Sequence, residues 1–114
     1  MNDPLRALQT ELRLSKIESR LFLYLVKIGR RTIDQISADL NCTRQEANKT
    51  SQDLVDLGMI IHISEFAYMP LHPRFAIVNR YREICRENNL PFRRNVLIDN
   101  IGIVLEKYFD HINV

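Results

Sequence analysis

Glycine and cysteine are scarce in this chain, which has three glycines and two cysteines among 114 residues. Isolated glycines do not form the glycine-rich loop that cradles phosphates in many nucleotide-binding enzymes. Cys42 and Cys85 are far apart and have no CxxC partner, so they predict reduced thiols and not a disulfide framework. We interpret Cys42 as a small spacer, with a redox-sensing thiol as the alternative. The three histidines lack paired spacing, so we expect neither a metal site nor a cofactor.

Long apolar runs are also missing. The densest run, Leu21 to Val26, has six residues, whereas a membrane-spanning helix needs about 18 or more. The N-terminal segment mixes charged residues with scattered leucines and lacks the continuous apolar region of a signal peptide. With 46% hydrophobic and 26% charged residues, we expect a globular protein of the cytoplasm that has no membrane partner.

Neither sign of charge dominates the chain. The net charge is +2, and residues 1–73 have nine basic and nine acidic side chains. Residues 74–114 have seven basic and five acidic side chains and therefore supply the whole excess. A nucleic-acid site would have to arise from a local arrangement and not from bulk charge.

Three capping boxes, in which Ser or Thr is followed three residues later by Glu or Gln, begin at Ser15, Thr32 and Thr43. Each one precedes a run with helical apolar spacing, and the third run extends to about residue 57. Gly29 and Asn41 suit the left-handed ends of the first two helices. The second and third helices are separated by about three residues, the turn length typical of a helix-turn-helix.

The pattern changes after Gly58. Runs rich in β-forming residues at 59–63 and 66–69 flank Ser64-Glu65 and predict a hairpin. Helical spacing returns at 74–88 and at about 94–112. This order predicts a mainly α fold with a small β-hairpin. We expect a winged helix-turn-helix domain at 1–73, followed by C-terminal dimerisation helices at 74–114.

The predicted helix at 44–57 offers the strongest candidate site. Its outward side chains suit major-groove reading, because Arg can pair with guanine, Asn or Gln with adenine, and Lys with phosphate. The predicted DNA-binding residues are Arg44, Gln45, Asn48, Lys49, Gln52, Arg30, Arg31 and Thr43.

We therefore predict a sequence-specific DNA-binding transcriptional regulator whose partner is double-stranded DNA. A winged-helix module that binds another protein is the alternative, which the neutral charge of residues 1–73 favours. We do not expect an enzyme, because no acidic cluster or nucleophile constellation is visible in the sequence.

The last predicted helix has an apolar stripe that is too wide to remain in water on a small monomer. It could fold back on its own domain, or it could pair with a second copy together with residues 4–12. We predict a homodimer, because two-fold pairing would present two recognition helices to successive major grooves. The candidate dimerisation residues are Leu97, Ile101, Val104, Leu105, Tyr108 and Ile112.

Residues 12–75 resemble the DNA-binding domain of the TrmB-like family of transcriptional regulators, which is common in archaea. The similarity rests on a Leu-x-Leu-Ser-x-x-Glu opening from Leu12, Gly29 and a Thr-x-x-x-Ile-Ser segment from Thr32. It continues with an arginine at the start of the recognition helix, a Leu-x-x-x-Gly-Met-Ile segment and a Tyr-x-Pro-x-x-Pro exit: Arg44, Leu54 to Ile60, and Tyr68 to Pro73.

The resemblance implies a winged-helix fold that binds DNA. Two features depart from the family pattern. The expected wing, Ser64-Glu65-Phe66, has no Arg or Lys, and 114 residues leave no room for the family's C-terminal sugar-sensing domain. We therefore expect no small-molecule effector.

Overall fold

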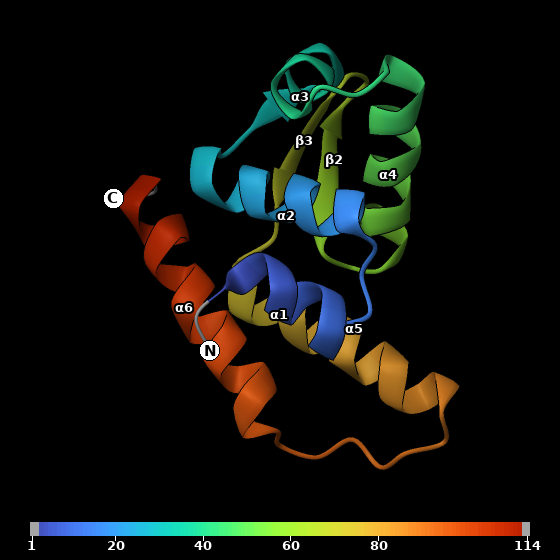
Figure 1. Ribbon diagram of the computed structural model, residues 1–114, viewed down its shortest axis with the longest axis vertical. Coiled ribbons are helices and arrows are strands. Elements are labelled where there is room, and N and C mark those ends of the chain that lie inside the picture. Colours follow the sequence, from blue (N-terminus) through green and yellow to red (C-terminus); the bar gives the residue numbers. More distant parts are fainter. Residues whose placement is uncertain (1–2, 113–114) are drawn as a thin grey trace.

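The computed structural model of the chain describes residues 3–112 and consists of six helices and a small sheet (Figure 1). The side chain of Ile112, a predicted dimer contact, lies outside the described part. The elements, in chain order, are α1 (Pro4–Glu11), α2 (Lys16–Ile28), β1 (Arg31–Thr32), α3 (Ile33–Leu40), α4 (Arg44–Asp56), β2 (Ile60–Ser64), β3 (Ala67–Pro70), α5 (Pro73–Glu87) and α6 (Val96–Ile112). The predicted fold class, mainly α with a hairpin in the winged-helix order, is confirmed.

All three predicted capping boxes are present. The hydroxyls of Ser15, Thr32 and Thr43 each accept a hydrogen bond from the backbone N–H three residues on, and the Glu or Gln there bonds back to the cap. Asn41 ends α3 in the left-handed conformation, with φ 55° and ψ 51°. Local chemistry therefore fixes where α2, α3 and α4 begin.

The sheet contains one more strand than the sequence predicts. It is antiparallel in the order β1-β3-β2, and β1 pairs Arg31 with Tyr68 and Thr32 with Ala67. A two-residue strand is too short to show an alternating pattern, so its pairing depends on tertiary contacts. The hairpin turn falls at Glu65 and Phe66, one residue later than expected, because a register irregularity lies between His62 and Ser64.

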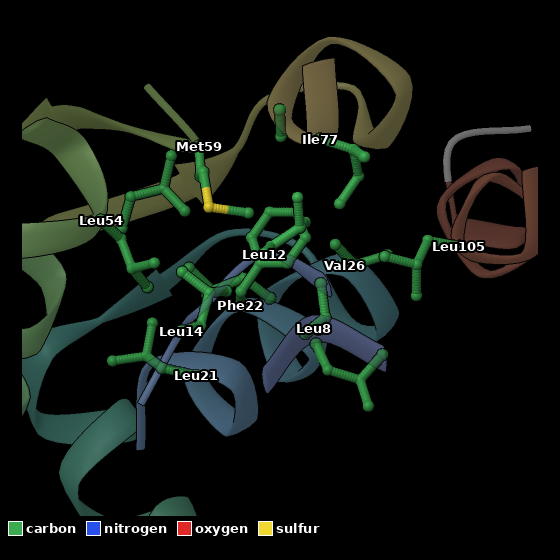
Figure 2. Close-up of a cluster of buried hydrophobic side chains, with 14 of the residues drawn as sticks. Leu8, Leu12, Leu14, Leu21, Phe22, Val26, Leu54, Met59, Ile77 and Leu105 are labelled. Carbon is green, nitrogen blue, oxygen red and sulfur yellow. The ribbon is translucent and has the colours of Figure 1, made fainter. Parts of the chain in front are cut away.

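One hydrophobic core unites the helices and the sheet around α2 (Figure 2). Phe22 and Val26 of α2 are fully buried, as are Leu8 of α1 and Leu54 of α4. The figure shows side chains from α1, α4, α5 and α6, and Met59 just before β2, converging on this helix. The core therefore draws on both predicted segments, 1–73 and 74–114.

Helix α6 folds back on its own chain. It packs against α1, α2 and α5, and in Figure 1 it runs along the side of the molecule where these helices meet. Ile98, Ile101 and Leu105 are at most 3% exposed. The sequence predicts Ile101 and Leu105 at a dimer seam, but in the structure they belong to the core of the chain itself. The apolar face of α6 that carries them is turned toward α1, α2 and α5. Leu97 and Tyr108 remain exposed, and Val104 is half-buried.

Candidate nucleic-acid interface

Helices α3 and α4 form a helix-turn-helix that is closed by a short, hydrogen-bonded turn. The Cys42 N–H donates to the Ser37 carbonyl at 3.1 Å, and the Ser37 hydroxyl donates to the Cys42 carbonyl at 2.6 Å. Burial, followed by the nearby Glu46 carboxylate, raises the pKa of the Cys42 thiol. A raised pKa keeps the sulfur protonated and unreactive, which agrees with the interpretation of Cys42 as a spacer.

Helix α4 buries one face and exposes the other. Ala47, Thr50, Ser51 and Leu54 point inward and are at most 6% exposed. Five of the eight side chains predicted to bind DNA belong to α4, and all five are exposed on the opposite face: Arg44, Gln45, Asn48, Lys49 and Gln52. These five side chains do not form one continuous site. Arg44, Gln45 and Asn48 line one groove, whereas Lys49 lines another depression.

The groove lined by Arg44, Gln45 and Asn48 lies between α4 and the hairpin turn, and we name it the α4 groove. It encloses about 600 Å³ and is lined by Ile33, Arg44, Gln45, Asn48, Glu65 and Phe66. Figure 1 shows why these residues meet, since the tip of the β2–β3 hairpin lies beside the start of α3 and the first turn of α4. A guanidinium and two amides therefore share one opening with the apolar ring of Phe66.

Arg44 is held at the edge of this groove by two neighbours. Its guanidinium lies 2.7 Å from the Asp34 carboxylate, and its central carbon lies 5.8 Å from the centre of the Phe66 ring. Asp34 belongs to the first turn of α3 and Phe66 to the hairpin turn. The ammonium or guanidinium of an exposed ion pair stays accessible to an anion, because such a pair contributes only about 0–1 kcal/mol.

Lys49 has acidic surroundings. Its ammonium lies 2.9 Å from the Asp53 carboxylate, and Glu18 and Glu46 line the same shallow depression, which we name the Lys49 flank. The hydrogen bond from Lys49 to Asp53 raises the pKa of Lys49. The exposed ion pair alone would leave this ammonium accessible, but three carboxylates around one ammonium make the surface acidic, so it is a poor candidate for a phosphate contact.

The remaining predicted residues lie outside the α4 groove or have another role. Gln52 donates from Nε2 to the Tyr68 hydroxyl at 2.8 Å and so ties α4 to β3.

Arg31 interacts with Tyr24, whose hydroxyl donates to Asp39, on the side of α2 and the end of α3. Arg30 does not line the α4 groove either. The Thr43 hydroxyl caps α4, because it accepts from the Glu46 N–H at 3.0 Å.

Sequence reasoning missed the roles of Asp34 and Phe66. Asp34 stands in the first turn of α3, where an acidic residue is explained by the helix dipole alone. In the sequence, Phe66 is visible only as part of a wing without Arg or Lys. Their meeting with Arg44 depends on how α3, α4 and the hairpin pack, for which the spacing along the chain contains no signal.

Two further properties of the described part, residues 3–112, bear on function. No helix there combines the length and the apolar character needed to cross a membrane. No three His, Cys, Asp or Glu side chains in that part gather as they would around a metal ion.

This arrangement of a helix-turn-helix, a hairpin wing and an exposed polar face on α4 defines a winged-helix protein of the DNA-binding type. Residues 8–75, more than half of the chain, match the family described as "Sugar-specific transcriptional regulator TrmB". The chain belongs to this TrmB family, a family of DNA-binding transcriptional regulators and not of enzymes. Searches of curated proteins and of solved structures each found no match.

The cap of α4 can be tested directly. Thr43→Ala should lower the free energy of unfolding by about 0.5–2 kcal/mol, because α4 loses the acceptor at its N-terminus. Hydrogen bonds from Thr43 also hold the pKa of Glu46 below its ordinary value of 4.5. A lowered carboxylate pKa stabilises the fold at neutral pH, and this contribution is lost as the pH falls through the lowered pKa.

Urea denaturation of the parent and Thr43→Ala at pH 7 and near pH 3 checks both points. The Thr43 N–H that bonds to the Glu46 carboxylate remains in the alanine variant, so both proteins should lose stability at the lower pH while most of the difference between them persists. Thr43→Ser is the matched control, because its hydroxyl can still cap the helix. Equal stability of the parent and Thr43→Ala at pH 7 would contradict the capping role.

Proposed function

We propose that this protein is a sequence-specific DNA-binding regulator of transcription that acts as a homodimer and reads the major groove with the first half of α4. The observation that carries the proposal is the α4 groove, in which Arg44, Gln45 and Asn48 are exposed together at the N-terminal end of a recognition helix. These three side-chain types recognise guanine and adenine edges by paired hydrogen bonds. The target is the cell's DNA, so we place the protein in the cytoplasm.

The charges around the site suggest that bases contribute more to binding than phosphates do. Residues 30–66 have four basic and six acidic side chains. Since three carboxylates lie around Lys49, and Arg31 faces Tyr24, few cations near α4 remain for the DNA backbone. A dimer would then neutralise about two to four phosphates, which gives a log–log salt slope of roughly −2 to −4.

The experiment is selection of binding sites from random duplexes, followed by affinity measurements across a salt series. We expect a defined selected sequence and a shallow salt slope. A parent protein that binds no duplex more tightly than about 10 micromolar at low salt would contradict the proposal, because a regulator binds its specific site at about 10 nanomolar or more tightly.

The proposed dimer seam is the exposed edge of α6 that borders α1 and α2. Leu97 lines a groove with Arg6 and Thr10 of α1, and Lys27 of α2 lies 4.8 Å from the ring centre of Tyr108. Leu97 is 58% and Tyr108 38% exposed, so both remain available to a second copy. Spacing of three to four residues places Val104 on the same edge.

Leu97→Glu should convert the dimer to a folded monomer, because it places a charge in the apolar seam while leaving the core of the chain intact. Light scattering gives the mass, and circular dichroism shows whether the helices persist. Ile103→Glu is the control, since Ile103 is 42% exposed and lies on another edge of α6. A dimer that survives Leu97→Glu, or that is lost in both variants, would remove this edge from the seam.

A protein-interaction module is the second candidate function. It is favoured by the Lys49 flank, where Glu18, Glu46 and Asp53 surround a single ammonium on the exposed side of α4. This acidic surface would repel phosphates but would suit a basic protein partner. Failure of the duplex-binding experiment would leave this function in place.

A further inference from the structure

The hairpin turn lacks the cations with which a wing would bind the DNA backbone, yet it is firmly attached to the helix-turn-helix. The carbonyl of Phe66 accepts a hydrogen bond of 2.8 Å from the N–H of Ile33, the first residue of α3. Next to this bond, β1 pairs with β3 through Thr32 and Ala67. The turn is therefore anchored to the start of α3.

This anchor places two groups around the guanidinium of Arg44. Asp34 follows Ile33 directly and pairs with Arg44 at 2.7 Å, while the Phe66 ring lies 5.8 Å from its central carbon. The ring is 52% exposed, so it is not held in place as part of the hydrophobic core. An arginine within about 6 Å of an aromatic ring is attracted to the ring face.

We propose that Phe66 and Asp34 are positioning residues that fix the guanidinium of Arg44 for one base pair, and that the hairpin contributes to specificity through Arg44 and not by contacting DNA. This inference rests on the proposed DNA-binding function and names the residues that set its specificity. The physical reason is entropic. A free arginine side chain has many rotamers, and restricting it before binding lowers the cost of making two hydrogen bonds to guanine.

A double-mutant cycle separates positioning from direct contact. Affinity for the selected duplex is measured for the parent, Phe66→Ala, Arg44→Ala and the double variant. Phe66→Ala alone should weaken binding about 2–5-fold, the effect of losing about 0.5–1 kcal/mol from an exposed cation–ring contact. In the Arg44→Ala background the same change should cost nothing further, since no guanidinium is left to position.

Three more variants sharpen the test. Phe66→Tyr keeps the ring and should restore parental affinity, whereas Phe66→Leu keeps only apolar volume and should resemble Phe66→Ala. Asp34→Asn should lower discrimination at the base pair read by Arg44 while strengthening binding to random duplex, because a carboxylate beside the phosphates is removed. The salt slope should stay unchanged in every Phe66 variant, as no phosphate contact is lost.

Equal losses from Phe66→Ala in both backgrounds would overturn the inference, because the ring would then act independently of Arg44. The inference would also be overturned if Phe66→Leu restored the DNA affinity as completely as Phe66→Tyr does. In the protein without DNA, the NMR signal of the Arg44 Nε–H should shift when Phe66 is replaced by alanine and stay in place with tyrosine. A parent that binds no duplex would instead remove the proposed function, and this inference with it.

Discussion

Ile101→Ala should lower the free energy of unfolding by about 2–5 kcal/mol. Ile101 is 1% exposed and lies on the inner face of α6, in the cluster that also contains Leu8, Phe22 and Leu105. Removing three carbon atoms there loses apolar burial and leaves a cavity that the helices around it can fill only in part. Urea or thermal denaturation followed by circular dichroism measures the loss.

The control for this prediction is an alanine substitution on the outside of the same helix. Ile103 carries the same side chain but is 42% exposed, so Ile103→Ala should change stability by less than about 0.5 kcal/mol. The pair distinguishes packing within the chain from pairing with a second copy. If Ile101→Ala converted a dimer to a monomer, measured as the mass in solution, but left the free energy of unfolding unchanged, Ile101 would belong to a dimer seam after all.

Much of the fold could be predicted from the sequence, because helix starts are decided by neighbouring residues. Ser15, Thr32 and Thr43 each sit three residues before a Glu or Gln, and all three form complete capping boxes. The apolar spacing of α2 likewise predicts a central helix, and Phe22 and Val26 are fully buried. Such signals are local and do not depend on how distant elements pack.

Features decided by packing could not be predicted. Strand β1 has two residues, and only its pairing with β3 makes it a strand. The apolar stripe of α6 predicts that one face of the helix is covered, but it does not show whether another part of the chain or a second copy covers it. In the structure, helices of the same chain cover Ile101 and Leu105. Periodicity identifies a face to bury, while the identity of its partner depends on tertiary structure.

In the candidate site, too, some features could be predicted from the sequence and others depend on packing. The exposed face of α4 followed from helical spacing, and all five predicted side chains of α4 are on it. The spacing did not show which of these cations can reach DNA. Lys49 pairs with Asp53 and Arg44 with Asp34, and the two ion pairs differ in their surroundings. Acidic neighbours from α2 and α4 flank Lys49, whereas Arg44 opens onto a groove with two amides.

This difference leads to a prediction about DNA recognition. Arg44→Ala should weaken binding to the selected duplex by about 1–3 kcal/mol, or roughly 5–150-fold, because a good paired contact to a base is lost. The loss should be confined to one base pair in each half-site, where preference should disappear. Repeating the selection with the variant and measuring its affinity by fluorescence anisotropy checks the magnitude and the position.

Lys49→Ala provides the matched control, since it removes the other cation from the same face of α4. The Lys49 ammonium is balanced by Asp53 and flanked by Glu18 and Glu46, so its loss should change affinity by less than about threefold and leave the selected sequence and the salt slope unaltered. Arg44 and Lys49 are both exposed, so neither variant should lose much stability. If Lys49→Ala instead weakened binding to all duplexes and Arg44→Ala had no effect, the DNA would lie against the Lys49 flank, and the α4 groove would not be the reading site.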